Sequence, residues 1–134
     1  MNERLNFYLE SVTTLIKDID ASILVCGGGK LDKSIFEKLG FINVTICNLD
    51  ARLNEDIFNP YKWKYENAES LSFDDNSFDY VVIHAAIHHA SLPHKVITEM
   101  YRVAKVGMLA IEGRDSLLIK MMEKIGLTSN YEHA

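Results

Sequence analysis

Residues 23–30 read Ile23-Leu24-Val25-Cys26-Gly27-Gly28-Gly29-Lys30, an apolar run that ends in three consecutive glycines. An amphipathic segment follows, so the order strand, tight turn, helix is predicted here. Glycines lack side chains, which lets a ligand approach the backbone, and the following helix directs its free N–H groups at the same place. The turn is therefore a candidate site for a nucleotide-like cofactor, although strand-to-helix turns that bind nothing also contain glycine.

The chain of 134 residues is 48% hydrophobic and 25% charged, which predicts a single globular domain over residues 1–134. Within it we expect an N-terminal helix in 1–20, a cofactor-binding core over 21–112, and a helix with a tail over 113–134. No apolar run approaches eighteen residues and the N-terminus does not read as a signal peptide, so no membrane partner is expected. The net charge of −5 argues against nucleic acid as a partner.

The two cysteines, Cys26 and Cys47, fall within predicted strands and show neither a disulfide framework nor the spacing of zinc ligands. Two buried thiols and a cytoplasmic location are therefore expected. Four histidines gather in residues 84–94, but no Cys, Asp or Glu stands among them at ligand spacing, so no metal site is expected.

Strand and helix signals alternate along the chain. Strands are predicted over 22–26, 44–47, 63–65, 78–84 and 106–112. Helices are predicted over 4–17, 31–39, 93–104 and 115–125, whereas residues 51–61 are expected to be irregular. This alternation predicts an α/β protein with a Rossmann-like, doubly wound parallel sheet and helices on both faces.

In such folds, ligands bind beyond the carboxyl ends of the strands, where the strand order reverses. Four features of the sequence meet there. They are the glycine turn, Asn48-Leu49-Asp50 at the end of the second strand, Asn67-Ala68-Glu69 after the third, and residues 77–89 around the fourth. The polar groups at 48 and 50 suit the hydroxyls of a ribose.

Residues 67–79 read Asn-Ala-Glu-Ser-Leu-Ser-Phe-Asp-Asp-Asn-Ser-Phe-Asp. This run resembles the class I S-adenosylmethionine-dependent methyltransferases, above all the quinone-biosynthesis (type 11) group, which typically reads acidic-Ala-Glu-x-Leu-Pro-Phe, a short turn, then Ser-Phe-Asp. Ile87-His88-His89 matches the family's Leu-His-His, and residues 99–105 match its Glu-x-x-Arg-Val-Leu-Lys. The resemblance extends from about residue 22 to 112, roughly two-thirds of the chain.

The resemblance implies five parallel strands in the order 3-2-1-4-5 and transfer of a methyl group from S-adenosylmethionine to a small-molecule acceptor. The implied cofactor-binding residues are Cys26, Gly27, Gly28, Gly29, Asn48, Asp50, Asn67, Ala68, Glu69 and His84. Of these, the glycine turn would approach the methionine part of the cofactor, Asn48 or Asp50 the ribose, and the loop around Ala68 the adenine. His84 and His88 are candidate catalytic residues, because an imidazole can accept the acceptor's proton near neutral pH.

Three positions depart from the family pattern. Val25 stands where the family has an acid two residues before the first glycine, Leu31 replaces the third glycine, and Val106 replaces a proline before the fifth strand. The missing acid removes one hydrogen-bonding anchor near the methionine end. One charge-assisted hydrogen bond contributes on the order of 1.5–3 kcal/mol, so weakened cofactor binding is expected.

The resembling enzymes continue with two further strands beside the fifth, and no segment after the last predicted helix supplies them. The fifth strand is therefore expected to be an edge with unpaired backbone groups. A fragment of a longer chain, a second subunit of a homo-oligomer that covers this edge, and a naturally short protein all fit. We expect the first.

Two functions other than methyl transfer follow from the same residues. A catalytically inactive, methyltransferase-like binding or interaction module fits Val25 and the missing strands. Nicotinamide-dependent reduction needs a Gly-x-Gly-x-x-Gly turn, and Asp32 stands in place of its third glycine. Placement of the cofactor at the turn predicts that Gly29→Val abolishes its binding without unfolding the domain.

Overall fold

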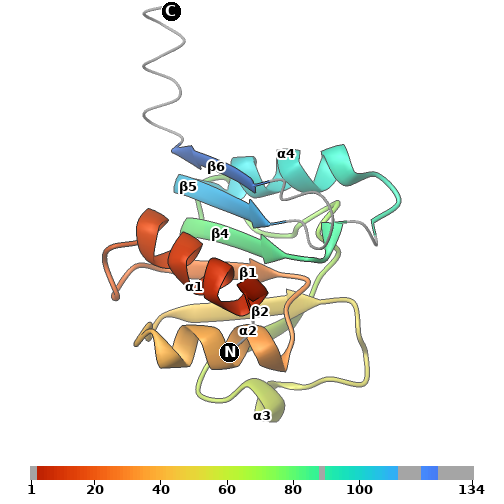
Figure 1. Ribbon diagram of the computed structural model, residues 1–134. Helices are drawn as coiled ribbons and strands as arrows, with labels where there is room; N and C mark the ends of the chain where they lie inside the picture. Colours follow the sequence, from red (N-terminus) through yellow and green to blue (C-terminus); the bar gives the residue numbers. More distant parts are fainter. Residues whose placement is uncertain (1–2, 88–89, 112–118, 124–134) are drawn as a thin grey trace, which may run out of the picture.

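A central sheet of six strands organises the molecule, in the order β3-β2-β1-β4-β5-β6 (Figure 1). The computed structural model describes residues 3–87, 90–111 and 119–123. The elements are α1 (Glu3–Leu15), β1 (Ile23–Cys26), α2 (Lys30–Lys38), β2 (Val44–Asn48), α3 (Glu55–Phe58), β3 (Lys62–Tyr65), β4 (Phe78–His84), α4 (Pro93–Val103), β5 (Ala104–Ile111) and β6 (Ile119–Glu123). Strands β1 to β5 pair in parallel, so the predicted order 3-2-1-4-5 is confirmed.

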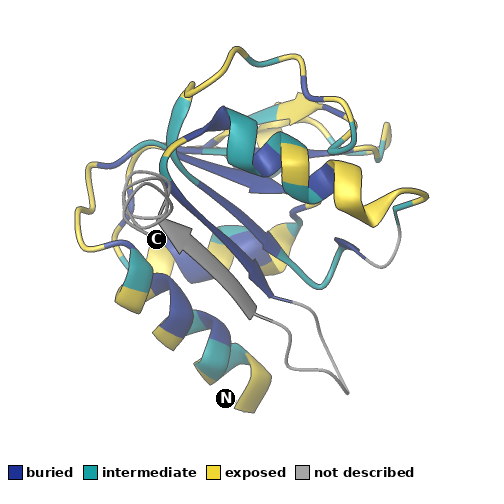
Figure 2. Ribbon diagram, turned by 90° about the horizontal axis from the view of Figure 1, so that it is seen from above, coloured by how far each residue is buried: buried dark blue, intermediate teal, exposed yellow. Residues whose placement is uncertain are grey.

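Helices cover both faces of the sheet (Figures 1 and 2). On one face, Tyr8 of α1 and Phe36 of α2 pack in a cluster with Val25. On the other, Met100 of α4 packs in a cluster with Leu24. All four residues of β1 are fully buried, as expected for a parallel strand covered on both sides, which explains its unbroken apolar sequence.

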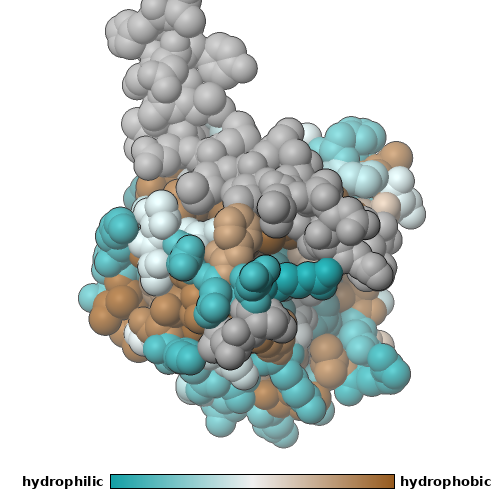
Figure 3. Space-filling model, in the orientation of Figure 1, coloured by the Kyte–Doolittle hydropathy of each residue, from teal (hydrophilic) through white to brown (hydrophobic). Residues whose placement is uncertain are grey.

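The outer surface of the layer formed by α1 and α2 contains both hydrophilic and hydrophobic side chains. Hydrophilic side chains lie beside hydrophobic ones over the face seen in Figure 3, which α1 and α2 share. This is the pattern of amphipathic helices that turn one side to a core. Within residues 3–87, 90–111 and 119–123, no helix is long and apolar enough to span a bilayer.

The end of the sheet differs from the sequence prediction. Residues 119–123, expected within a helix over 115–125, form strand β6, which pairs antiparallel with β5 from Gly107 opposite Glu123 to Ile111 opposite Ile119. The prediction that the sheet stops at a bare fifth strand is therefore wrong. Because β6 takes up that edge, β5 does not offer it to a second subunit.

A short helix also stands in the segment expected to be irregular. Residues 55–58 form α3, and the side chain of Asn54 caps it by accepting a hydrogen bond from the backbone N–H of Ile57 at 3.2 Å. In contrast, the described crossover from β3 to β4 holds no helix. This crossover, residues 66–77, is an extended loop that borders the carboxyl ends of the strands.

Candidate functional site

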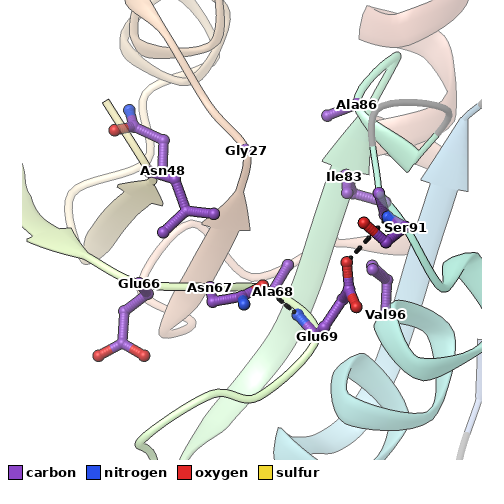
Figure 4. Close-up of a pocket in the computed structure, with 12 residues that line it drawn as sticks. Gly27, Asn48, Glu66, Asn67, Ala68, Glu69, Ile83, Ala86, Ser91 and Val96 are labelled. Atoms are coloured by element: carbon purple, nitrogen blue, oxygen red, sulfur yellow. Dashed lines mark hydrogen bonds between the residues drawn. The ribbon is translucent and has the colours of Figure 1, made fainter. Parts of the chain in front are cut away.

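A cavity of about 390 Å³ opens at the carboxyl ends of β1, β2 and β4 (Figure 4). Its lining residues come from the glycine turn, the end of β2, the loop after β3 and the segment between β4 and α4. They are Gly27, Asn48, Leu49, Glu66, Asn67, Ala68, Glu69, Ile83, Ala86, Ala90, Ser91 and Val96. This is the place at which doubly wound folds bind their ligands.

The three glycines of the turn meet different requirements. Gly27 has a φ of +61°, and a Cβ there would lie 2.7 Å from the Cβ of Ala86. A Cβ at Gly28 would lie 2.8 Å from Cγ2 of Ile46, so this glycine lets the turn pack on the sheet. At Gly29 no atom lies within 4 Å of an added Cβ, so the backbone there faces open space.

Asn48 fastens the turn to β2. Its Nδ2 donates to the carbonyl of Gly28 at 2.7 Å, and its Oδ1 accepts from the backbone N–H of Asp50 at 3.1 Å and from Nε1 of Trp63 at 3.3 Å. The residue is only 8% exposed, and its amide points away from Ala68 (Figure 4). Both the donor and the acceptor of the Asn48 side-chain amide therefore form hydrogen bonds within the protein.

Asp50, the other predicted ribose ligand, lies beside the cavity rather than in its lining. Arg52 binds its carboxylate with two hydrogen bonds of 2.9 Å, from Nε and Nη2. These bonds lower the pKa of Asp50 below its ordinary value. The Arg52 side chain is 89% exposed, so the pair is readily rearranged in water.

The loop after β3 forms one wall of the cavity. Oδ1 of Asn67 accepts from the backbone N–H of Glu69 at 3.0 Å, and Oε2 of Glu69 accepts from the backbone N–H of Ser91, also at 3.0 Å. The two dashed lines in Figure 4 follow these bonds. Glu69 therefore joins the loop to the opposite wall.

Glu66 stabilises the loop from inside. Its buried carboxylate accepts from the backbone N–H of Ser72 at 2.9 Å and from the Ser72 hydroxyl, and it pairs with Lys64 at 3.2 Å. Burial acts to raise the pKa of Glu66, but these partners outweigh it and the pKa lies below its ordinary value. An ionised Glu66 is therefore part of the folded loop.

The Glu-x-x-Arg residues of α4 hold the same loop from outside. Oε1 of Glu99 accepts from the backbone N–H of Leu71 at 2.8 Å, and Nη2 of Arg102 donates to the carbonyl of Leu71 at 3.1 Å. Nε of Arg102 also donates to Oε2 of Glu99 at 2.7 Å, which lowers the pKa of Glu99 against the opposing effect of burial. This pair positions the wall of the cavity and does not line it.

A second group of polar residues lies on the α1 side of the glycine turn. The Tyr8 hydroxyl donates to Oδ1 of Asp32 at 2.7 Å, and the backbone N–H of Gly29 donates to Oδ2 of Asp32 at 2.7 Å. The ring of His84 stacks on that of Tyr8 with centroids 4.2 Å apart and planes at 12°. Burial raises the pKa of Asp32, while Tyr8, Gly29 and His84 act in the opposite direction.

The structure brings five of the predicted site residues into the cavity lining: Gly27, Asn48, Asn67, Ala68 and Glu69. Five others lie elsewhere: Cys26, Gly28, Gly29, Asp50 and His84. Cys26 is buried next to Cys47 in the neighbouring strand, and the hydrogen bond between the thiols, together with burial, raises its pKa. His88 falls outside the described residues.

Seven lining residues were not among the predicted site residues, although the first three lie in segments predicted to border the site: Leu49, Ile83, Ala86, Glu66, Ala90, Ser91 and Val96. Most are apolar or small, so no chemical pattern marks them. The sequence prediction also missed that Asp32 bonds the backbone of the glycine turn at Gly29. The signal available was an acid three residues after the last glycine, the position from which a side chain reaches back to a helix start.

The parallel sheet, the glycine turn and the cavity at its carboxyl edge define the class of α/β proteins that bind nucleotide-like ligands. The sequence model described as "Methyltransferase domain" matches residues 24–111. The chain belongs to this methyltransferase domain family.

Curated relatives agree with this membership. The chain is similar to the ubiquinone/menaquinone biosynthesis C-methyltransferase of Hydrogenovibrio crunogenus, at 31% identity over 94 residues, which is 63% of this chain and 37% of that protein. It is also similar to the enzyme of the same name from Zymomonas mobilis, at 49% identity over 45 residues, which is 34% of this chain and 19% of that protein. The chain thus spans well under half of these relatives.

Solved structures share the fold. The YcgJ protein of Bacillus subtilis aligns with a TM-score of 0.67 and 20% identity, over 81% of this chain and 50% of that one. A putative sarcosine dimethylglycine methyltransferase from Galdieria sulphuraria aligns with a TM-score of 0.67 and 22% identity, over 81% of this chain and 46% of that one.

Proposed function

We propose that this chain binds S-adenosylmethionine in the cavity and forms the cofactor-binding part of an enzyme that methylates a small molecule. The observation that carries the proposal is the cavity at the carboxyl ends of β1, β2 and β4, with Gly27 in its lining where a Cβ has no room. Membership of the methyltransferase domain family supports the choice of ligand. The acceptor and the atom methylated are left open by both.

The residues present fit the nucleoside part of this cofactor. A volume of about 390 Å³ lies within the range of small-molecule sites. The lining combines apolar residues such as Ile83 and Val96 with the polar loop 66–69, a mixture suited to a heterocyclic base. For the ribose we favour Asp50, because the amide of Asn48 is already used by Gly28 and Trp63.

When bound, the cofactor supplies an electrophilic methyl group on a sulfonium. The contribution of the chain is chiefly alignment, since transfer between two held groups depends on their placement. The loop 66–69 would hold the base, and the turn at Gly27 would leave room for the sulfonium side of the ligand. We keep His84 and His88 as candidate bases; the ring of His84 is held in place by Tyr8.

Calorimetric titration with S-adenosylhomocysteine, S-adenosylmethionine and NAD tests the proposal. We expect saturable micromolar binding of the first two and none of NAD. Gly27→Ala should weaken binding, whereas Gly40→Ala, at another positive φ with open space around it, should not. Absence of binding by both sulfur nucleosides would contradict the proposed function.

The inactive binding module stays as a second candidate. Val25 is fully buried and packs in the core where the family pattern has an acid, so the turn lacks that polar group. This candidate predicts cofactor binding without methyl transfer to any acceptor, or no binding at all. Transfer of a labelled methyl group to a small-molecule extract would exclude it.

A further inference from the structure

A second groove, with a volume of about 460 Å³, opens at the opposite end of the sheet from the cavity. Residues at the amino ends of four strands line it: Ser22 before β1, Asn43 before β2, Lys62 at the start of β3 and Phe78 at the start of β4. The cavity described above lies at the carboxyl ends instead, and the two share no lining residue. A ligand in the groove would therefore leave the cavity open.

The groove exists because no helix covers this part of the sheet. It lies on the α4 face, since Thr45 in its lining pairs with Leu24, which packs in the cluster beneath α4. On that face α4 packs against β4 and β5. The described crossover from β3 to β4 holds no helix, so β2 and β3 are bordered here by the loop at Phe73 and the start of β4.

One side of the groove presents a positive charge beside a hydroxyl. Lys62 and Lys64 are two residues apart on β3, so their side chains share a face, and Lys62 is paired with Thr45 on the neighbouring strand, about 4.8 Å away. Nζ of Lys64 already bonds Ser72 at 3.0 Å and Glu66 at 3.2 Å. In the described part of the chain, neither the Lys62 ammonium nor the Thr45 hydroxyl has a side-chain partner. Both are therefore available to an anion.

The other side of the groove is aromatic. The rings of Phe73 and Phe78 meet edge to face, with centroids 5.0 Å apart and planes at 90°. Both residues are half-buried, so part of each ring is left for a ligand to contact. Nζ of Lys64 lies 4.8 Å from the centroid of the Phe73 ring. A flat ring packs well against such a pair, so a molecule with a ring and an anionic group meets both sides.

The ordinary use of lysine on an edge strand accounts for only part of this arrangement. Edge lysines keep a strand from pairing with other chains, and β3 is an edge strand. That role requires neither aromatic rings nor an unbonded hydroxyl beside the charge. The lining holds two lysines and one acid, Glu55, whereas the whole chain carries a net charge of −5. The local charge therefore complements an anion on a chain that otherwise repels one.

We propose that this groove binds a small aromatic carboxylate. The ring packs against Phe73 and Phe78, and the carboxylate is held by the Lys62 ammonium and the Thr45 hydroxyl. The site is separate from the cavity at the carboxyl ends of the strands, and it does not rest on the proposed function. It gives the domain a second ligand of a different chemical class.

The test uses 2-naphthoate as the probe and 2-naphthamide, its neutral counterpart, as the matched ligand. In NMR titrations of the ¹⁵N-labelled chain, 2-naphthoate should shift the amide signals of Thr45 and Lys62. We expect saturation with a dissociation constant of about 1 mM or below, the scale for a ligand of about 13 non-hydrogen atoms. 2-Naphthamide should shift the same signals but bind about threefold more weakly or worse, because it lacks the charge.

Three variants separate the contributions of charge and ring. Lys62→Gln should weaken 2-naphthoate about threefold or more and leave 2-naphthamide within about twofold, because it removes one exposed charge-assisted contact. Lys38→Gln, at an exposed position in the last turn of α2, makes the same change in net charge and should alter neither ligand. Phe73→Leu should weaken both ligands, since both use the ring.

Three results would overturn the proposal. The first is the absence of saturable shifts with 2-naphthoate. The second is a set of shifts confined to residues such as Gly27 and Ala68, which would place the probe in the cavity instead. The third is an equal effect of Lys62→Gln and Lys38→Gln on 2-naphthoate, which would reduce the attraction to the overall charge of the chain.

Discussion

Replacement of Gly27 by alanine should destabilise the fold and obstruct the cavity together. The backbone at Gly27 has a φ of +61°, which costs a residue with a Cβ about 1–2 kcal/mol. The new Cβ would also lie 2.7 Å from the Cβ of Ala86, far inside van der Waals contact. Overpacking of this kind costs typically about 1–3 kcal/mol.

Part of that cost is offset, because alanine lowers the conformational entropy of the unfolded chain, which raises the free energy of unfolding by about 0.4–1 kcal/mol. The expected decrease in the free energy of unfolding is therefore about 2–4 kcal/mol. Gly40→Ala separates the cost of the positive φ from the cost of the close contact with Ala86. Gly40 has a φ of +87° with no atom within 4 Å of an added Cβ, so its substitution should cost only about 1 kcal/mol.

Urea unfolding followed by circular dichroism measures both variants, and calorimetry measures binding of S-adenosylhomocysteine. Ala86→Gly in the Gly27→Ala background should restore part of the stability, as a double-mutant cycle would detect. If Gly27→Ala is no less stable than Gly40→Ala and binds ligand normally, the close approach of the turn to Ala86 has been misjudged.

Two further predictions concern the loop and the turn. The hydrogen bond from Arg102 lowers the pKa of Glu99 in the folded protein. The ionised Glu99 therefore stabilises the fold at a pH above the ordinary glutamate pKa of about 4.3. This contribution is lost as the pH falls through the pKa of Glu99 in the folded protein. Glu99→Gln should therefore be less stable than the wild type by about 1–2 kcal/mol at pH 7, with the difference shrinking below about pH 4 in thermal unfolding; a constant difference would contradict this. Gly29→Val should keep its unfolding midpoint, since its side chain meets open space, yet lose S-adenosylhomocysteine; unchanged affinity would remove the ligand from the turn.

Most of the sheet could be predicted because β1, β2, β4 and β5 contain short apolar runs separated by turns, whereas β3 reads Lys-Trp-Lys-Tyr and gives a weaker signal. β1 is buried on both faces, so its sequence has no alternation and stands out against polar neighbours. The segment 119–123 could not be predicted in the same way. Its residues suit a helix locally, and pairing with β5, a tertiary contact, decides the outcome.

The site was predictable in location but only partly in its contacts. Asn48 at the end of a strand carries a visible polar signal, but the sequence does not reveal that Gly28 and Trp63 occupy its amide. The lining residue Ala86 has no chemical signature at all; its importance appears only when the turn at Gly27 is set against it.

The thiols of Cys26 and Cys47 offer a built-in probe for ligand discovery. Both are fully buried near the carboxyl ends of adjacent strands, directly before Gly27 and Asn48. A thiol reagent can label them only when this part of the sheet opens, so the labelling rate reports how often it does. Any compound that binds above the carboxyl ends of these strands should slow labelling, because binding stabilises the closed sheet. Collections of candidate acceptors can therefore be screened without knowledge of the reaction.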